Sequence, residues 1–167
     1  MNEDTKIKGF EAPIYFEYSY TAGATTTLFL KKLLEGKIVG QRCPICKGVY
    51  VPPRGSCPRD GVATEEEVEV AHTGTVESFT INYIPIPDGD VDPPFVSANI
   101  VLDGADLSFM HLISGVPHDE VRIGMRVKAL WKPKEDWEPS LTNILYFEPL
   151  DEPDRDIDDL LNKYKNA

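Results

Sequence analysis

The sequence lacks long hydrophobic runs: no apolar stretch approaches the ~20 residues that a membrane-spanning helix requires. It also lacks the start of a secretory signal, because its first ten residues, MNEDTKIKGF, are acidic and polar. We therefore expect a protein of the cytoplasm without a membrane partner. Its 167 residues are enough for one medium domain or two small ones.

Positive charge is scarce and unevenly spread. The chain has 17 lysines and arginines against 28 acidic residues, a formal net charge of −11. Residues 31–60 nevertheless hold seven basic and two acidic residues, whereas residues 61–150 hold 16 acidic and five basic ones. An anionic ligand or an acidic partner would bind at the basic segment. Nucleic-acid binding needs several Lys or Arg contacts and a positive groove, so the acidic region argues against it, although the basic segment offers a small patch.

Cysteine is also rare: the chain has three, and all lie in one short segment. They follow the pattern C-x2-C-x10-C-x2-D, formed by Cys43, Cys46, Cys57 and Asp60. Two short knuckles separated by a hairpin-length insert are typical of a structural zinc site, and a carboxylate oxygen is an acceptable zinc ligand. A glycine follows each half, Gly48 and Gly61, and suits a turn that brings backbone N–H groups toward metal-bound atoms; the sequence thus predicts one structural Zn²⁺.

Two alternatives to this metal site stay open. The three cysteines could hold metal with another group, such as water, in the fourth position, or the ribbon could be degenerate and hold no metal. A site closed by four protein ligands leaves no position for a reacting water, so its expected role is to stabilise the fold.

The N-terminal part of the chain is predicted as an arm, a helix and the ribbon strands. Residues 1–23 are rich in aromatic side chains and lack a helical period, so we expect an extended arm that packs on this domain or on a partner. Residues 24–35, ATTTLFLKKLLE, predict a short amphipathic helix that ends at Gly36. A strand over residues 37–41 leads into the first knuckle, and residues 48–54 are expected as a hairpin.

From residue 67 onward, the sequence alternates between β-rich segments and turns. Residues 67–86 are β-rich with a break expected at Gly74, and residues 95–104 and 105–114 predict a hairpin around Asp103 and Gly104. Further strands are expected within residues 117–133, with a bend at Gly124, and over 141–150. Five strands in about eighty residues favour a small closed barrel. Residues 153–165 place acids before lysines, which predicts a short C-terminal helix.

These segments resemble the zinc-ribbon plus OB-fold family catalogued as domain-of-unknown-function family thirty-five. The resemblance rests on GKIVGQRCPICKGVYVPPRGSCPRDG, GTVESFT, FVSANIVLDGAD and VRIGMRVKALW, and it covers roughly residues 12–150. Asp60 departs from the fourth cysteine usual in the family. The expected fold is mainly β (α+β): arm and helix over 1–36, a rubredoxin-like zinc ribbon over 37–66, a five-stranded OB-fold barrel over 67–150 and a helical tail over 151–167.

The resemblance implies a function beside an enzyme. Family members work with thiolase-fold enzymes that handle acyl-CoA thioesters, so it implies an accessory subunit of a thiolase or aldolase complex with such a partner. CoA or an acyl-CoA would then be a ligand of the complex. Its phosphates, or the partner, would contact the basic side chains around the knuckles: Arg42, Lys47, Arg54 and Arg59.

Catalytic residues are not predicted on this chain. The cysteines are committed to metal, and His72, His111 and His118 lie far apart in the sequence without a recognisable motif. Paired acids such as Asp103 and Asp106 at a hairpin are usually turn formers. The remaining alternatives are a single-stranded nucleic-acid-binding OB domain and an adaptor that bridges two acyl-CoA enzymes without contacting their intermediates.

Overall fold

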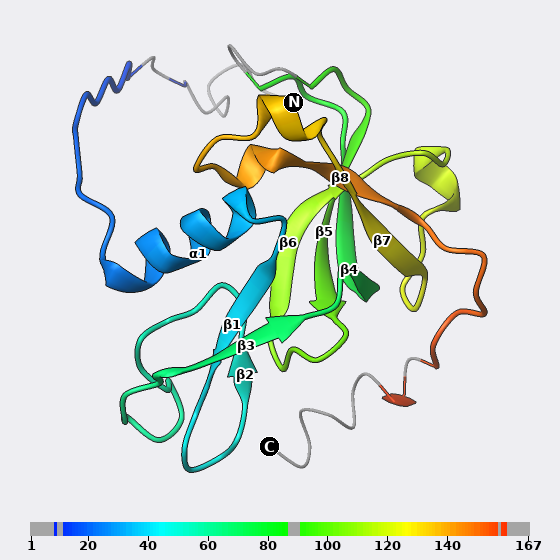
Figure 1. Ribbon diagram of the computed structural model, residues 1–167. Helices are drawn as coiled ribbons and strands as arrows, with labels where there is room; N and C mark the ends of the chain where they lie inside the picture. Colours follow the sequence, from blue (N-terminus) through cyan, green and yellow to red (C-terminus); the bar gives the residue numbers. More distant parts are fainter. Residues whose placement is uncertain (1–8, 10–11, 87–90, 157, 160–167) are drawn as a thin grey trace, which may run out of the picture.

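The computed structural model describes residue 9 and residues 12–86, 91–156 and 158–159. One helix leads into a three-stranded sheet, and a closed five-stranded barrel follows (Figure 1). The mainly β architecture predicted from the sequence, with an N-terminal helix, a ribbon and a barrel, is confirmed. None of the helices in the described part of the chain has the length and apolar character needed to span a bilayer.

Helix α1 (Ala24–Leu34) forms where the amphipathic pattern predicts it and buries Phe29 and Leu33. Gly36 ends it with a φ of 74°, a left-handed conformation that suits a residue without a side chain. The ring of Trp137 lies so close that a Cβ at this glycine would approach it to 2.8 Å. The end of the helix therefore packs against the loop that contains Trp137.

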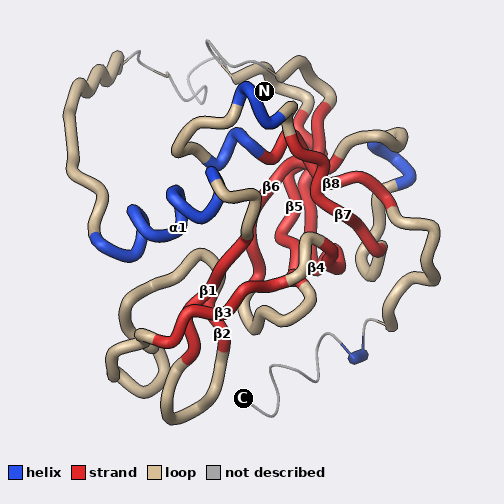
Figure 2. The backbone as a smooth tube through the Cα atoms, viewed as in Figure 1, coloured by secondary structure: helices blue, strands red, loops and turns tan. Residues whose placement is uncertain are grey.

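The ribbon sheet has the order β2-β1-β3 and is antiparallel throughout. Figure 2 shows its three strands in red. Strand β1 (Ile38–Arg42) lies between β2 (Val49–Tyr50) and β3 (Glu66–Val70), with Arg42 opposite Val49 on one side and Glu66 on the other. The hairpin expected over residues 48–54 is thus only two residues of strand. Strand β3 comes from the β-rich segment that follows the knuckles. Its pairing with β1 therefore joins residues that lie far apart in the sequence.

The barrel is formed by β4 (Thr73–Asn82), β5 (Phe95–Leu102), β6 (Ser108–Ile113), β7 (Arg126–Trp131) and β8 (Ile144–Pro149). Its strand order is β4-β5-β6-β8-β7, and the only pair that is parallel, β6 with β8, registers through Ile113 and Phe147. Three-residue 3₁₀ turns lie at His118–Glu120, Lys134–Asp136 and Leu141–Asn143. The last of these replaces the start of the strand expected over 141–150.

Gly74 does not interrupt a strand, contrary to the sequence-based expectation. The chain leaves β3 and enters β4 through Ala71 and His72, and Gly74 lies inside β4, paired with Leu102 on one side and Val127 on the other. A Cβ there would approach the Val101 carbonyl oxygen to 2.7 Å. The glycine therefore serves a close approach of neighbouring strands.

The helix, the ribbon sheet and the barrel share one hydrophobic core. Phe29 and Leu33 of α1, Ile38 of β1 and Phe147 of β8 belong to a single buried cluster. A continuous core of this kind fixes the ribbon against the barrel. The position of the knuckles relative to the barrel is therefore defined.

A cluster of charged residues surrounds Asp103, which follows β5 and accepts a backbone hydrogen bond from Ala71, just after β3. Arg126, whose side chain is 8% exposed, donates hydrogen bonds to Asp103 and Thr75 and pairs with Glu152. The Arg155 N–H donates to the Gly124 carbonyl oxygen at 2.9 Å, so the segment after β8 lies along the barrel. The helix predicted from residue 153 does not begin there: residues 153–156 are not helical, residues 158–159 are, and the rest of it lies outside the described residues.

Candidate metal centre

The first knuckle of the ribbon is the turn at residues 43–48, between β1 and β2. The Lys47 N–H donates to the Cys43 carbonyl oxygen at 3.1 Å, and the Cys43 N–H donates to the Gly48 carbonyl oxygen at 2.9 Å. The Ile45 N–H points at Cys43 Sγ at 3.4 Å. The backbone of this turn thus brings an N–H donor to a sulfur, as expected for a metal-bound thiolate.

The second knuckle, residues 57–62, repeats the same bonds. The Gly61 N–H donates to the Cys57 carbonyl oxygen at 2.9 Å, and the Cys57 N–H to the Val62 carbonyl oxygen at 2.8 Å. The Asp60 N–H points at Cys57 Sγ at 3.3 Å. The two turns are therefore equivalent, with Asp60 in the place that Cys46 takes in the first.

The predicted role of the two glycines holds for one of them. Gly61 has a φ of 68°, but in the first turn the equivalent left-handed residue is Lys47, with a φ of 64°, and Gly48 lies one position later. A Cβ at Gly48 would lie 3.3 Å from the Tyr50 hydroxyl and 3.5 Å from Cys46 Sγ. Gly48 therefore leaves room beside the sulfurs, while Lys47 carries the turn and donates from Nζ to the Pro44 carbonyl oxygen.

The structure brings the four predicted side chains together. One ligand atom from each of Cys43, Cys46, Cys57 and Asp60 lies within 4.8 Å of the others. Asp60 Oδ2 lies 3.2 Å from Cys43 Sγ and 3.3 Å from Cys57 Sγ, and the sulfurs of Cys46 and Cys57 are 3.7 Å apart. Cys43 and Cys57 are buried and Cys46 is half-buried.

This donor set fits a tetrahedral zinc ion. Zinc–sulfur bonds of ~2.3 Å at tetrahedral angles place two sulfurs ~3.8 Å apart, and a carboxylate oxygen bound at ~2.0 Å lies ~3.5 Å from each sulfur. The sulfur–sulfur distance of 3.7 Å agrees with that geometry, and the two oxygen–sulfur distances of 3.2 and 3.3 Å are slightly shorter. Three thiolates and one carboxylate would complete four-coordination without a bound water.

The electrostatics of the cluster follow from its burial and its mutual hydrogen bonds. Hydrogen bonds from Cys46 and Cys43 lower the pKa of the Asp60 carboxyl. Burial raises the pKa of the Cys43 thiol to about 11. Without a cation the Cys43 thiol thus keeps its proton, and a bound divalent cation would displace it.

Tyr50 is a residue of this centre that the spacing pattern did not indicate. Its hydroxyl, at the end of β2, lies 3.2 Å from Cys57 Sγ and 3.7 Å from Cys46 Sγ. The hydrogen bond to Cys57 is the main reason why the pKa of the Tyr50 hydroxyl is raised. A buried tyrosine needs a partner for its hydroxyl, and here that partner is a ligand sulfur. The signal in the sequence was a tyrosine two residues after the glycine of the first knuckle.

Three of the seven basic residues in residues 31–60 are paired with acidic side chains of β3. Arg42 binds Glu66 at 3.1 Å and the Lys47 carbonyl oxygen at 3.2 Å. Lys32 pairs with Glu67 and Lys37 with Glu69. The three acids lie on β3, just past the basic segment, so they compensate part of its positive charge. Among the described residues, Arg54 and Arg59 are exposed and form no ion pair.

The three histidines lie on different elements, away from the cysteine cluster. His72 accepts a hydrogen bond at Nδ1 from Trp131 Nε1, and burial lowers its pKa. His111, in β6, packs against the rings of Phe109 and Phe147, and burial lowers its pKa as well. His118 meets the ring of Tyr83 edge-on. Each imidazole therefore packs with an aromatic ring.

Two neighbouring grooves lie on the outside of the barrel where β6 meets β8. One has a volume of about 430 Å³ and is lined partly by His118; the other, of about 620 Å³, is lined partly by His111, and both contact Leu112 and Leu145. Their walls are mainly apolar, and neither includes a residue of the cysteine cluster. These grooves are therefore separate from the candidate metal centre.

Two family models match the chain in succession. Residues 30–66 match the ChsH2 rubredoxin-like zinc ribbon domain, and residues 67–132 match the ChsH2 C-terminal OB-fold domain. A "DUF35 domain-containing scaffold protein" of Methanocaldococcus jannaschii is 31% identical over 117 residues, which cover 68% of this chain and 82% of that protein.

A "probable enoyl-CoA hydratase alpha subunit" of Thermomonospora curvata is 33% identical over 97 residues, 58% of this chain but only 30% of that protein. Among solved structures, the "Ltp2-ChsH2(DUF35) aldolase" matches with a TM-score of 0.61 and 26% identity over 78% of this chain and 98% of that one. A DUF35-family protein of unknown function from Sulfolobus solfataricus matches in fold, with a TM-score of 0.56 and 22% identity over 76% of this chain and 84% of that one.

Proposed function

The chain belongs to the DUF35 family of zinc-ribbon and OB-fold proteins, and from this membership we propose that it is a non-catalytic accessory subunit of an acyl-CoA enzyme complex. The observation that carries the proposal is the similarity, in sequence and in fold, to a scaffold protein and to the DUF35 chain of an aldolase complex. The catalytic residues of such a complex would lie on the partner chain.

The partner in this proposal is a thiolase-fold enzyme that makes or cleaves a carbon–carbon bond next to an acyl-CoA thioester. The reactive thiolate of such chemistry would come from that enzyme, because the three cysteines of this chain lie together in the metal centre. The relative described as a hydratase subunit makes a different acyl-CoA enzyme the main competitor. Identification of the partner separates the two.

The metal centre has a structural part in this proposal. Cys43, Cys46, Cys57 and Asp60 would hold one zinc ion, which cross-links the two knuckles and contributes its binding free energy to folding. Leu107, from the loop between β5 and β6, packs against the cysteine cluster. Metal binding would thus stabilise both the ribbon and the barrel loop under it.

In this proposal, the phosphates of CoA would contact those basic side chains that are not already bound to groups of this chain. Of the four basic side chains considered above, Arg42 is occupied by Glu66 and Lys47 donates to the Pro44 carbonyl oxygen. Arg54 and Arg59 remain exposed for phosphate contact. Replacing both with alanine should weaken binding of CoA to the assembled complex, measured by calorimetry. The control is Lys134→Ala, at an exposed lysine in the loop between β7 and β8.

Single-stranded nucleic acid is the less favoured ligand. The barrel region is acidic, and three basic residues of the ribbon and the helix are paired with Glu66, Glu67 and Glu69. Backbone recognition needs several free Lys and Arg side chains along a groove, and this pairing reduces their number. A salt-dependent complex with single-stranded DNA or RNA would reverse this preference.

The test of the proposed function is purification from the native source at low salt, with native mass spectrometry and zinc analysis on the same sample. We expect a complex with an acyl-CoA enzyme chain and about one zinc ion per copy of this protein. A lone chain that binds neither an enzyme nor a CoA thioester would refute the proposal. Removing this chain distinguishes an accessory subunit, whose loss abolishes the partner's activity, from an adaptor, whose loss only uncouples two enzymes.

A further inference from the structure

The segment before α1 is an extended arm with two different faces. In residues 14–21 the even positions are Ile14, Phe16, Tyr18 and Tyr20, and the odd positions are Tyr15, Glu17, Ser19 and Thr21. Successive side chains of an extended strand point to opposite sides, so one face is apolar and aromatic and the other is mostly polar.

The contacts within the arm agree with this arrangement. The rings of Tyr18 and Tyr20, two residues apart, have centroids 6.5 Å apart on one face. The hydroxyl of Tyr15 donates to Glu17 Oε2 at 3.5 Å on the other. Both contacts join residues i and i+2, the spacing that places side chains on the same side of a strand.

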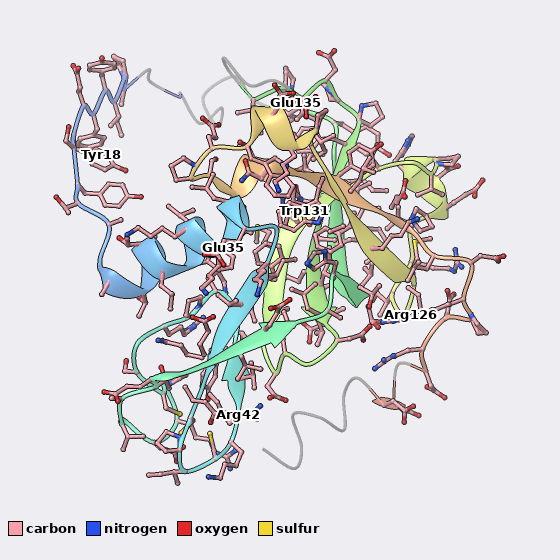
Figure 3. The ribbon with its side chains drawn as sticks, in the orientation of Figure 1. Tyr18, Glu35, Arg42, Arg126, Trp131 and Glu135 are labelled. Carbon is pink, nitrogen blue, oxygen red and sulfur yellow. The ribbon has the colours of Figure 1, made fainter. Side chains whose placement is uncertain are left out.

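The arm has the pattern of a strand but no strand to pair with. Over residues 12–21, every hydrogen bond and ring contact found among the described residues is internal to the arm, and the segment runs away from the body of the molecule (Figures 1 and 3, Tyr18). The apolar face is open to solvent: the exposed fractions are 76% for Ile14, 80% for Phe16, 79% for Tyr18 and 80% for Tyr20.

An exposed surface of this size indicates a binding site. Burying one aromatic side chain removes ~150–250 Å² from water, so the four residues of the apolar face offer on the order of 600 Å². A stable protein–protein interface buries ~800 Å² on each partner. Most of one side of such an interface is therefore present in eight residues.

Among the described residues, a second copy of this chain offers apolar grooves where β6 meets β8, but it is a less suitable receptor than a separate enzyme subunit. The barrel of the copy is closed, and the ribbon sheet has only two edges, β2, which is two residues long, and β3, which carries Glu66, Glu67 and Glu69. Each copy has a net charge of −11, and the arm itself brings Glu17, so two copies repel each other.

We propose that residues 14–20 bind as an added strand to the enzyme subunit of the complex, with Ile14, Phe16, Tyr18 and Tyr20 in an apolar groove beside an open sheet edge. Strand addition uses main-chain hydrogen bonds for affinity and pockets for alternate side chains for specificity. The pockets would be spaced ~6.6 Å apart, two residues of a strand, with a polar group at the end of those that hold tyrosine. This inference rests on the proposed function, because the receptor is the acyl-CoA enzyme itself.

Two tyrosines on opposite faces provide a matched test. Tyr18→Ser and Tyr15→Ser make the same chemical change three residues apart, at side chains that are 79% and 85% exposed. Each full-length variant is titrated against the purified enzyme subunit that accompanies the wild-type chain in its native complex. Tyr18→Ser should raise the dissociation constant ~10–100-fold and Tyr15→Ser less than ~3-fold. The melting temperature of the free chain should not change in either variant.

A second measurement reads the backbone directly. Amide hydrogen exchange over residues 14–20 should slow in the complex relative to the free chain, because an added strand protects its N–H groups. Equal effects of the two serine variants, or unchanged exchange, would overturn the arm as the docking element while leaving the subunit role intact. A free wild-type dimer that Tyr18→Ser converts to monomers would assign the arm to a second copy instead. If no acyl-CoA enzyme accompanies the wild-type chain, both the arm proposal and the proposed function fail.

Discussion

Val49 and Asp106 exchange two hydrogen bonds across the junction between the ribbon and the barrel. The Val49 N–H donates to Asp106 Oδ2 at 2.9 Å, and the Asp106 N–H donates to the Val49 carbonyl oxygen at 2.8 Å. Val49 begins β2, directly after the first knuckle, and Asp106 lies in the loop between β5 and β6. The pair therefore fixes the metal-binding end of the ribbon to one end of the barrel.

Asp106→Ala should loosen this junction. It removes the side-chain acceptor for the Val49 N–H, which we expect to cost about 0.5–1.5 kcal/mol of unfolding free energy, because Asp106 is exposed and water can replace it in part. Chemical denaturation measures the change. Asp119→Ala, at an exposed aspartate in the 3₁₀ turn His118–Glu120, is the control and should change the stability by less than ~0.5 kcal/mol. Equal losses in the two variants would contradict the role of Asp106.

Asp60→Cys tests the fourth metal ligand. The variant places a thiolate where the second knuckle already aims a side chain at Cys43 and Cys57, so zinc affinity should stay equal or rise. Competition with a chromophoric chelator measures the affinity. Asp60→Ala, which leaves three ligands, should bind zinc more weakly than the wild type. A clear loss of zinc in Asp60→Cys would refute the assignment of Asp60.

Cys43→Ser should remove the metal and destabilise the ribbon. Cys43 is fully buried and contacts Asp60, so the substitution removes a thiolate ligand on the buried side of the cluster. The loss of zinc affinity should exceed the ~10–100-fold that removal of an outer partner typically costs. Since structural zinc contributes its binding energy to folding, the melting temperature should fall and should no longer respond to a chelator. Unchanged melting and unchanged metal content would contradict the structural role.

Local patterns in the sequence predicted the knuckles well. The spacing of three cysteines and Asp60 indicated a ligand set, and the four side chains do converge. The reason is that each knuckle is a turn of six residues whose backbone hydrogen bonds are all local. The placement of the left-handed residue was less accurate, because Lys47 adopts a conformation that the sequence pattern assigned to a neighbouring glycine.

Relations between distant segments were not visible in the sequence. The basic character of residues 31–60 is partly compensated by Glu66, Glu67 and Glu69, which lie just beyond that segment and reach it because β3 pairs with β1. Asp103 and Asp106 lie in the turn between β5 and β6, as expected, but they also bind Arg126 and Val49, which the sequence did not indicate. Strand pairing at long sequence separation decides both cases, and no local motif encodes it.

Tyr50→Phe tests the hydrogen bond between the Tyr50 hydroxyl and Cys57 Sγ. Tyr50 is not itself one of the four predicted metal ligands. Removing the hydroxyl leaves Cys57 Sγ without its donor at 3.2 Å, while the ring still fills the same space. Outer-shell partners typically contribute ~10–100-fold to metal affinity, and we expect a loss near the lower end, about tenfold, because the Asp60 N–H still points at the same sulfur. Tyr146→Phe, on β8, is the matched control and should leave the zinc affinity unchanged. Equal affinities in both variants would exclude Tyr50 from the centre.

Asp103 should make the stability of the barrel depend on pH at acidic values. Although burial by itself would raise its pKa, hydrogen bonds from Arg126 and Thr73 and the charges of Arg126 and Arg155 outweigh that effect, so the pKa of Asp103 lies below its ordinary value of 3.8. A carboxyl with a lowered pKa stabilises the folded state above its unfolded pKa, and this contribution is lost as the pH falls through the folded value.

Asp103→Asn keeps the shape of the side chain but removes the negative charge that pairs with Arg126 and Arg155. At pH 7 the variant should be less stable than the wild type by about 1–3 kcal/mol, a value reduced because Asp103 is a quarter exposed. The difference should hold from pH 7 down to about pH 4 and shrink below it, as Asp103 of the wild type takes up a proton. Denaturant unfolding at several pH values measures it, and acid release of zinc, common to both proteins, cancels in the comparison. A difference that is constant down to pH 2 would show that the Arg126–Asp103 pair does not produce this dependence.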